Sequence, residues 1–176
     1  VGAGRKVLFL TAVLPHQLNR GSVLRTRESL RALADMGCII DLVILNRSDK
    51  SLSSSSIEKE VRKLYVGVRG VVVKRHPTFS KKEDRKGYDF ICKLDSIFGK
   101  DGMISNENLC PKNFRTAVAK NAEKCDYDDI FVNYLYLLPA VPPGLRNQAV
   151  VDIHDFQTNR ICNDVVPTLP EGKQVQ

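Results

Sequence analysis

Two short apolar runs separated by one amphipathic segment set the strongest constraint on the fold of this chain. Lys6–Thr11 (KVLFLT) and Ile39–Leu45 (IIDLVIL) have the length and composition of strands buried on both faces. Between them, Ser22–Met36 carries apolar residues at helical spacing, with Ser22 as the expected cap and Gly37 as a left-handed end. Strands joined through a helix run parallel, so this segment predicts the first unit of a parallel sheet.

Strands and helices are expected to alternate along the rest of the chain as well. The further strands are predicted at Val71–Lys74, Asp129–Asn133 and Ala149–Ile153. The further helices are predicted at Tyr88–Phe98, at Lys112–Lys124, and in a short segment that is capped within Ser51–Ser56 and ends at Leu64. This order indicates an α/β fold: a Rossmann-like, mostly parallel sheet with helices on both faces.

The chain has 176 residues, which is room for one domain with a substantial core. We expect this domain to span residues 1–165, followed by a polar tail or the start of an interdomain linker at 166–176. Parallel sheets of this kind bind ligands at the carboxyl ends of their strands. The segments expected there are Thr11–Ser22, Asn46–Asp49, Asn133–Tyr136 and Asp152–Arg160.

The composition excludes several classes of protein. Hydrophobic residues make up 43% of the chain and charged residues 27%, as in ordinary globular proteins and unlike disordered or collagenous ones. The longest nearly uncharged apolar stretch, Ile130–Pro143, is much shorter than the roughly 20 residues of a membrane-spanning helix. The five cysteines include no CxxC pair, so we expect reduced thiols, no zinc module and a cytoplasmic location.

Three common motifs of nucleotide-binding and hydrolytic enzymes are missing from the sequence. Gly2 and Gly4 precede the first predicted strand instead of following it, so they do not form the phosphate-binding turn of a dinucleotide fold. The sequence contains neither the GxxxxGK[ST] of P-loop proteins nor the GxSxG of serine hydrolases.

The first candidate site is the loop that leads into the first predicted helix. Gly21 lies directly before this helix, where a ligand's anionic group can approach unpaired backbone amides and the positive end of the helix dipole. Arg20 and Arg25 would strengthen an anion site at Gly21 and Ser22. The alternatives are solvated arginines, and a glycine that is needed only for its conformation.

The second candidate site follows the last predicted strand, in the segment VVDIHDFQTNR. Side chains alternate along a strand, so Asp152 and His154 are expected on one face, with Asp155 at the strand's exit. His154 is a candidate proton acceptor for a hydroxyl, oriented by a neighbouring carboxylate, and Arg160 is a candidate anion ligand. The alternatives are a buried histidine bonded to backbone carbonyls, Asp155 as a helix cap, and an Arg160–Asp155 ion pair.

Charge is distributed unevenly along the chain. The whole chain carries a formal net charge of +7, yet residues 1–88 hold 18 basic and 8 acidic side chains, whereas residues 89–176 hold 9 and 12. We expect one side of the molecule to be basic, either as a surface that attracts phosphates or simply as a solubilising surface. The sequence contains no tryptophan and does not interleave basic with aromatic residues, so no platform for nucleic-acid bases is expected.

Taken in order, these segments resemble the amino-terminal half of two-domain glycosyltransferases of the GT-B architecture, especially the large family four. The resemblance rests on KVLFLT, GSVLRTRESLRALADMGCIIDLVIL, DDIFVNYLYLLP and VVDIHDFQTNR, and it spans Lys6 to Arg160. The last segment is similar to the family's VxDxHD sequence followed by an arginine.

The resemblance implies an acceptor-side domain that faces a second domain holding most of a nucleotide-sugar donor. It implies that His154 and Asp155 lie near the acceptor or the transferred sugar as catalytic residues. The residues that would contact the donor are Gly21, Ser22, Arg25 and Arg160. No metal or other cofactor is implied, because helix amides and basic side chains stabilise the departing diphosphate in such enzymes.

The implied partners are the nucleotide-sugar donor and a glycan or lipid-linked acceptor, in polysaccharide or glycoconjugate biosynthesis. Contact with the inner face of a membrane is compatible with this, and we expect no nucleic acid. The family's carboxyl-terminal domain is missing from these 176 residues, so we expect them not to catalyse transfer alone. The alternatives are a non-catalytic basic module that binds an anionic polymer or membrane surface, and a self-contained α/β enzyme of another class.

Overall fold

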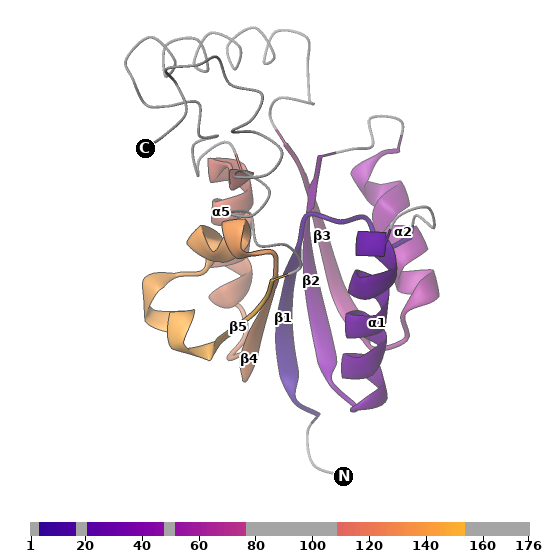
Figure 1. The fold of residues 1–176 in the computed structure, drawn as a ribbon, viewed down its shortest axis with the longest axis horizontal. Coiled ribbons are helices and arrows are strands. Elements are labelled where there is room, and N and C mark those ends of the chain that lie inside the picture. The colour runs from indigo at the N-terminus through magenta and orange to yellow at the C-terminus, as the bar shows by residue number, and fades with distance from the viewer. Residues whose placement is uncertain (1–3, 17–20, 48–51, 77–108, 154–176) are drawn as a thin grey trace, which may run out of the picture.

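The computed structural model describes residues 4–16, 21–47, 52–76 and 109–153. One sheet of five strands runs through this part of the chain in the order β3-β2-β1-β4-β5. The strands are β1 (Lys6–Thr11), β2 (Ile39–Asn46), β3 (Val68–Arg75), β4 (Asp129–Asn133) and β5 (Ala149–Asp152). Every neighbouring pair is parallel, which confirms the predicted α/β, Rossmann-like sheet (Figure 1).

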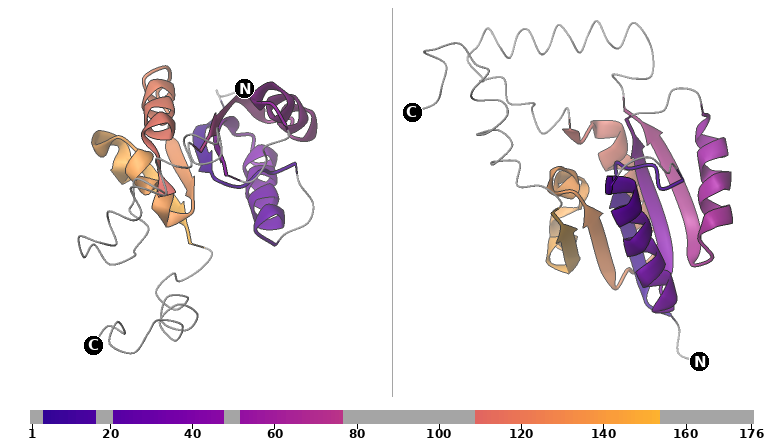
Figure 2. Two further views of the ribbon diagram at one scale, coloured as in Figure 1. Left: turned by 90° about the horizontal axis from the view of Figure 1, so that it is seen from above. Right: turned by 45° about the vertical axis from the view of Figure 1, so that its right-hand side comes forward.

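Helices cover both faces of this sheet (Figure 2). One face carries α1 (Gly21–Asp35) and α2 (Ser54–Leu64). The other carries α5 (Lys112–Ala122) and two short 3₁₀ helices, η2 (Leu135–Ala140) and η3 (Pro143–Gln148). Within the described ranges, no helix is long and apolar enough to cross a membrane.

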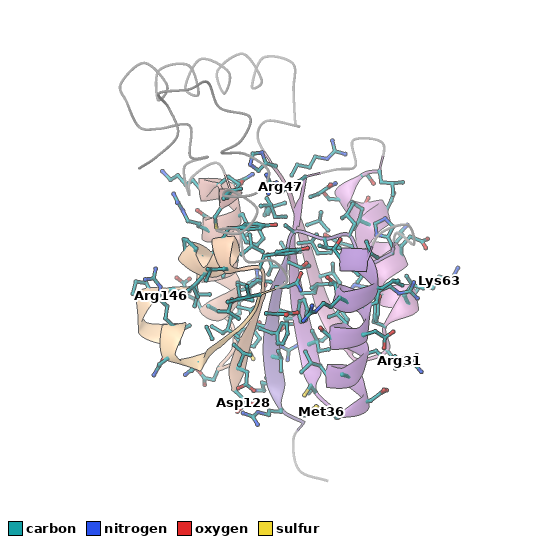
Figure 3. The ribbon with its side chains drawn as sticks, in the orientation of Figure 1. Arg31, Met36, Arg47, Lys63, Asp128 and Arg146 are labelled. Atoms are coloured by element: carbon teal, nitrogen blue, oxygen red, sulfur yellow. The ribbon has the colours of Figure 1, made fainter. Side chains whose placement is uncertain are left out.

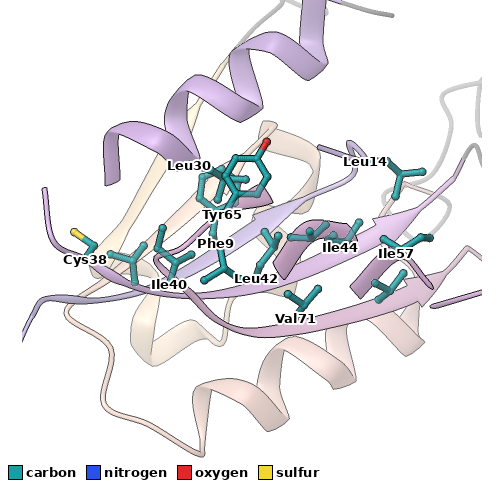
Figure 4. Close-up of a cluster of buried hydrophobic side chains, with 14 residues drawn as sticks. Phe9, Leu14, Leu30, Cys38, Ile40, Leu42, Ile44, Ile57, Tyr65 and Val71 are labelled. Atoms are coloured by element: carbon teal, nitrogen blue, oxygen red, sulfur yellow. The ribbon is translucent and has the colours of Figure 1, made fainter. Parts of the chain in front are cut away.

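The alternation of side chains along β1 divides the core into two layers. Val7 and Phe9 pack beneath α1 and α2 together with Leu30 and Ile57 (Figure 4). Leu8 and Leu10 point to the opposite face, into the cluster that α5 supplies with residues such as Phe114. A strand with apolar residues on both faces must be covered from both sides, which explains why the sequence of β1 shows an uninterrupted apolar run.

Most of the expected elements are present, with shifts at their ends. The predicted bounds of β1 and β4 are correct, and Gly37 adopts the expected left-handed conformation with φ 77°. Helix α2 is capped as expected within the serine run: the Ser53 hydroxyl accepts a hydrogen bond of 3.1 Å from the backbone N–H of Ser56. Strand β3 begins at Val68, three residues before the prediction.

The predicted cap at Ser22 is wrong. Helix α1 begins at Gly21, so Ser22 lies inside its first turn. Two other predictions, the helix at Tyr88–Phe98 and the domain end at 165, fall outside the described residues.

Because all the strands are parallel, their carboxyl ends meet along one edge of the sheet, which we call the carboxyl edge. The register aligns the last residues of three neighbouring strands there: Thr11 of β1 lies opposite Asn133 of β4, which lies opposite Asp152 of β5. Strand β2 continues two residues beyond Ile44, the partner of Thr11. We call the opposite end, where the strands begin, the amino edge. Figure 3 shows Arg47 at the carboxyl edge and Met36 and Asp128 at the amino edge.

Candidate functional site at the carboxyl edge

Gly21 begins α1 in an ordinary backbone conformation. Among the described glycines only Gly37 has a positive φ, so the conformational explanation for a glycine at position 21 is not supported. A Cβ placed on Gly21 would have no atom within 4 Å. The first amides of a helix have no partner within it, and nothing bulky stands before this glycine in the described structure. Among the described residues, no side chain or backbone atom crowds this position, which suits the approach of an anionic ligand to the start of α1.

Arg25 of α1 lies beside Asp152, the last residue of β5. Their charged atoms, Nη2 of Arg25 and Oδ1 of Asp152, are 3.5 Å apart, and the two side chains are 57% and 15% exposed. This ion pair joins the first turns of α1 to the end of β5, although an exposed pair of this kind stabilises the fold by at most about 1 kcal/mol. Val151 packs in the opposite layer, so the predicted alternation along β5 is confirmed for these two residues.

A buried hydrogen-bonded group lies at the ends of β1 and β4, between these strands and α1. The Asn133 side-chain oxygen accepts from the hydroxyl of Thr11 at 3.1 Å, and it lies 3.2 Å from the hydroxyl of Thr26. The Thr26 hydroxyl is also 2.9 Å from the carbonyl of Ser22, one turn earlier in the helix. All three side chains are buried, so these bonds fix α1 to the carboxyl edge. Sequence reasoning pointed to the strand ends but did not identify this group.

Tyr134, directly after β4, has a backbone conformation that L-residues rarely adopt, with φ 91° and ψ 125°. Its ring stacks on that of Tyr136 with centroids 5.3 Å apart, and the Arg47 guanidinium carbon lies 5.6 Å from the centre of the Tyr136 ring. A non-glycine residue pays about 1–3 kcal/mol for such a conformation. Stacking on Tyr136 returns about 0.5–1.5 kcal/mol beyond the burial of the rings, so the side chain offsets part of this cost.

His16, after β1, has both ring nitrogens buried, and neither bonds to another described residue. No other described residue has a buried side-chain nitrogen or oxygen atom without a partner. Buried polar atoms in native proteins are nearly always paired, so His16 is a further candidate residue at this edge. Sequence reasoning missed His16, although its place after the first strand was a usable signal.

The structure brings three of the sequence-predicted site residues to the carboxyl edge and leaves the others undescribed. Gly21, Ser22 and Arg25 lie in the first two turns of α1, and Arg25 contacts Asp152. The other candidates lie outside the described residues: Arg20, His154, Asp155 and Arg160, together with the charged segment from 81 to 86.

A second polar cluster, at the amino edge, was also missed. Asp41 of β2 is buried, forms a bidentate ion pair with Arg69 of β3, and accepts a 2.7 Å hydrogen bond from the Tyr127 hydroxyl. The Arg69 guanidinium also lies 3.5 Å from the sulfur of Cys125. A side chain at position 70 would collide with the Asp41 carboxylate, so Gly70 leaves room for it. The available signal was a single acidic residue within the apolar run IIDLVIL.

Opposing effects set the protonation of this cluster. Burial alone would raise the pKa of Asp41, but hydrogen bonds from Arg69 and Tyr127 and the charge on Arg69 outweigh it and hold that pKa below its ordinary value. For Tyr127, burial and the hydrogen bond to Asp41 both raise the pKa well above 10.0. Asp41 is therefore ionised and Tyr127 neutral at pH 7.

Within the described ranges, no group of three or more His, Cys, Asp or Glu side chains is placed to hold a metal ion. Comparisons of the chain with protein-family models, with curated proteins and with solved structures find no match.

Proposed function

We propose that this chain is the acceptor-side half of a two-domain GT-B glycosyltransferase, which transfers a sugar from a nucleotide-sugar donor to a glycan or lipid-linked acceptor. The observation that supports the proposal is the start of α1 at Gly21, uncrowded by any described atom, on the carboxyl edge of a parallel sheet. The order β3-β2-β1-β4-β5 changes direction between β1 and β4, and ligands of such sheets bind outside the strand ends at this point.

The chemistry of this edge suits a substrate with both phosphate and hydroxyl groups. Backbone amides at the start of α1, near Gly21 and Ser22, favour an anion, and the partly exposed guanidinium of Arg25 adds positive charge. In the proposed enzyme these groups, with Arg160, lie near the donor diphosphate and stabilise it as it departs, without a metal. His154 and Asp155 act on the acceptor side, where an imidazole takes the proton of the attacking hydroxyl.

The test is sugar transfer by the polypeptide of the complete reading frame that contains these residues. The donors are UDP-glucose, UDP-N-acetylglucosamine and GDP-mannose, offered with lipid and glycan acceptors, and release of nucleoside diphosphate is the readout. We expect release with at least one donor, and a loss of about tenfold or more in kcat/KM in Arg25→Ala. The matched control is Arg31→Ala, on the same helix, whose side chain is 72% exposed and pairs only weakly with Asp35. It should retain wild-type activity.

Two results would contradict the proposal. The first is the absence of nucleoside diphosphate release with every donor. The second is equal activity in the Arg25 and Arg31 variants. If the inactive protein instead bound anionic vesicles or heparin with a steep dependence on salt, the basic binding module would be the better hypothesis.

A further inference from the structure

We propose that Tyr134 and Tyr136, together with Arg47, form a platform that binds a pyranose ring of the acceptor. We call this group the tyrosine platform. The inference rests on the proposed function, because it assigns the acceptor's sugar to one part of the same edge. The sequence predicted that these residues lie in segments at the carboxyl ends of the strands, but it assigned none of them as a ligand.

The platform lies where the sheet favours ligand binding. Tyr134 follows β4 directly, and its backbone N–H donates a 3.1 Å hydrogen bond to the carbonyl of Asp152. Arg47 follows β2, and Tyr136 lies in η2 after β4, so the contact between them spans the end of β1, which lies between β2 and β4 in the sheet. The platform therefore stands at the reversal between β1 and β4. The start of α1 lies on the other face of the sheet at the same edge.

The side chains offer what a sugar ring requires. A pyranose has an apolar face of C–H groups and a rim of hydroxyls that both donate and accept hydrogen bonds. Tyr134 and Tyr136 are both partly exposed and present aromatic surface, and the guanidinium of Arg47 supplies donors. A phosphate would gain from Arg47 but nothing from the two rings, whereas a pyranose can use both the aromatic surface and the guanidinium donors, so this combination favours a sugar.

The backbone of Tyr134 gives a second, independent reason. Its φ of 91° suits glycine, and glycine would keep the hydrogen bond from the backbone N–H to Asp152. What glycine would lose is the ring itself. Backbone strain of this kind gathers at ligand-binding sites, so a strained tyrosine at this edge of the sheet supports a function for its ring.

The experiment is saturation-transfer NMR on the 176-residue chain with methyl glycosides of glucose, galactose, mannose and N-acetylglucosamine at millimolar concentration. We expect transfer to the ring protons of at least one glycoside. Tyr134→Gly should weaken its binding by about tenfold while leaving Tm unchanged or higher. Tyr134→Phe keeps the ring and should bind within about threefold of the wild type. Leu135→Ala is the matched control, because this neighbour is exposed but lies outside the platform.

Two results would overturn the platform: no transfer to any glycoside, and equal binding by Tyr134→Gly and the wild type. If equal binding came with a lower Tm in Tyr134→Gly, the role of the ring would be structural. Binding of UMP that depends on Tyr134, without binding of glycosides, would assign the platform to a nucleobase instead. None of these measurements uses a nucleotide-sugar donor or sugar transfer. Glycoside binding can therefore be observed even if the transfer assay detects no activity, and transfer can be observed even if no glycoside binds the isolated chain.

Discussion

The amino edge and the carboxyl edge of the sheet handle polar side chains in different ways. At the amino edge, Asp41 is buried and receives hydrogen bonds from both Arg69 and Tyr127. At the carboxyl edge, the ion pair between Arg25 and Asp152 is long and mostly exposed on the arginine side. Removing one partner of the buried pair leaves an uncompensated charge and is costly, whereas the long, exposed Arg25–Asp152 pair adds little stability and leaves the guanidinium accessible to a ligand.

The same contrast holds for the backbone. At the amino edge, Gly70 relieves crowding beside Asp41. At the carboxyl edge, Tyr134 is a non-glycine residue in a conformation that favours glycine, and a Cβ at Gly21 would meet no described atom within 4 Å. The amino edge thus avoids a steric clash, whereas the carboxyl edge keeps a strained backbone conformation. This is the distribution expected when ligands bind at only one end of the sheet.

The largest effect should come from breaking the amino-edge cluster with Asp41→Asn. The variant leaves Arg69 without its anion and weakens the hydrogen bond from Tyr127. We expect the free energy of unfolding to fall by about 3 kcal/mol, measured by urea denaturation. The matched control is Asp129→Asn, which removes an anion from the exposed Arg5–Asp129 pair and should cost less than about 1 kcal/mol. Equal losses in the two variants would show that burial of Asp41 adds nothing.

A pair of glycine substitutions compares the two edges directly. Gly70→Ala places a methyl group against the Asp41 carboxylate and should lower the free energy of unfolding by about 2 kcal/mol. Gly21→Ala meets no atom within 4 Å and replaces a poor helix former, so it should leave the free energy unchanged or raise it by up to about 1 kcal/mol. A substantial loss of stability in Gly21→Ala would mean that this glycine is needed for folding, and it would remove the main support for an anion site there.

The difference between the edges also explains what sequence reasoning found and what it missed. Local patterns identified the strands, because a buried parallel strand such as Lys6–Thr11 is continuously apolar whatever its neighbours are. The polar clusters depend on contacts between distant segments: Asp41, Arg69 and Tyr127 come from three separate parts of the chain. No local pattern reveals that a single acidic residue in a strand will meet an arginine from the next strand.

At the carboxyl edge, the topology rule gave the right region but not the residues. The rule pointed to Asn133–Tyr136, yet neither the hydrogen bond from Thr11 to Asn133 nor the conformation of Tyr134 can be derived from composition. The predicted cap at Ser22 failed for a similar reason. A helix can begin one residue earlier, at Gly21, when tertiary contacts such as the buried Thr26 fix its position.

The smallest effect concerns the pH dependence of the amino-edge cluster. The pKa of Asp41 is lowered in the folded protein, so its contribution is present above its ordinary pKa of 3.8 and is lost as the pH falls through the folded value. The pKa of Tyr127 is raised, so its contribution is complete below 10.0 and is lost as the pH rises beyond it. Tyr127→Phe should lower the free energy of unfolding by about 1 kcal/mol at pH 7, because Asp41 loses one donor.

The same variant should reduce the loss of stability between pH 9 and pH 11, measured by urea denaturation at each pH. It should not abolish that loss, because burial also raises the pKa values of Tyr65 and Tyr136. Tyr65→Phe is the matched control. The pKa of Tyr65 is raised by burial, but its hydroxyl donates to the Pro15 carbonyl and not to a carboxylate. Tyr65→Phe could instead reduce the loss of stability between pH 9 and pH 11 more than Tyr127→Phe does. The hydrogen bond from Tyr127 to Asp41 would then not be the main cause of that loss, and the amino edge would not differ from the carboxyl edge in the coupling of its ionisable groups.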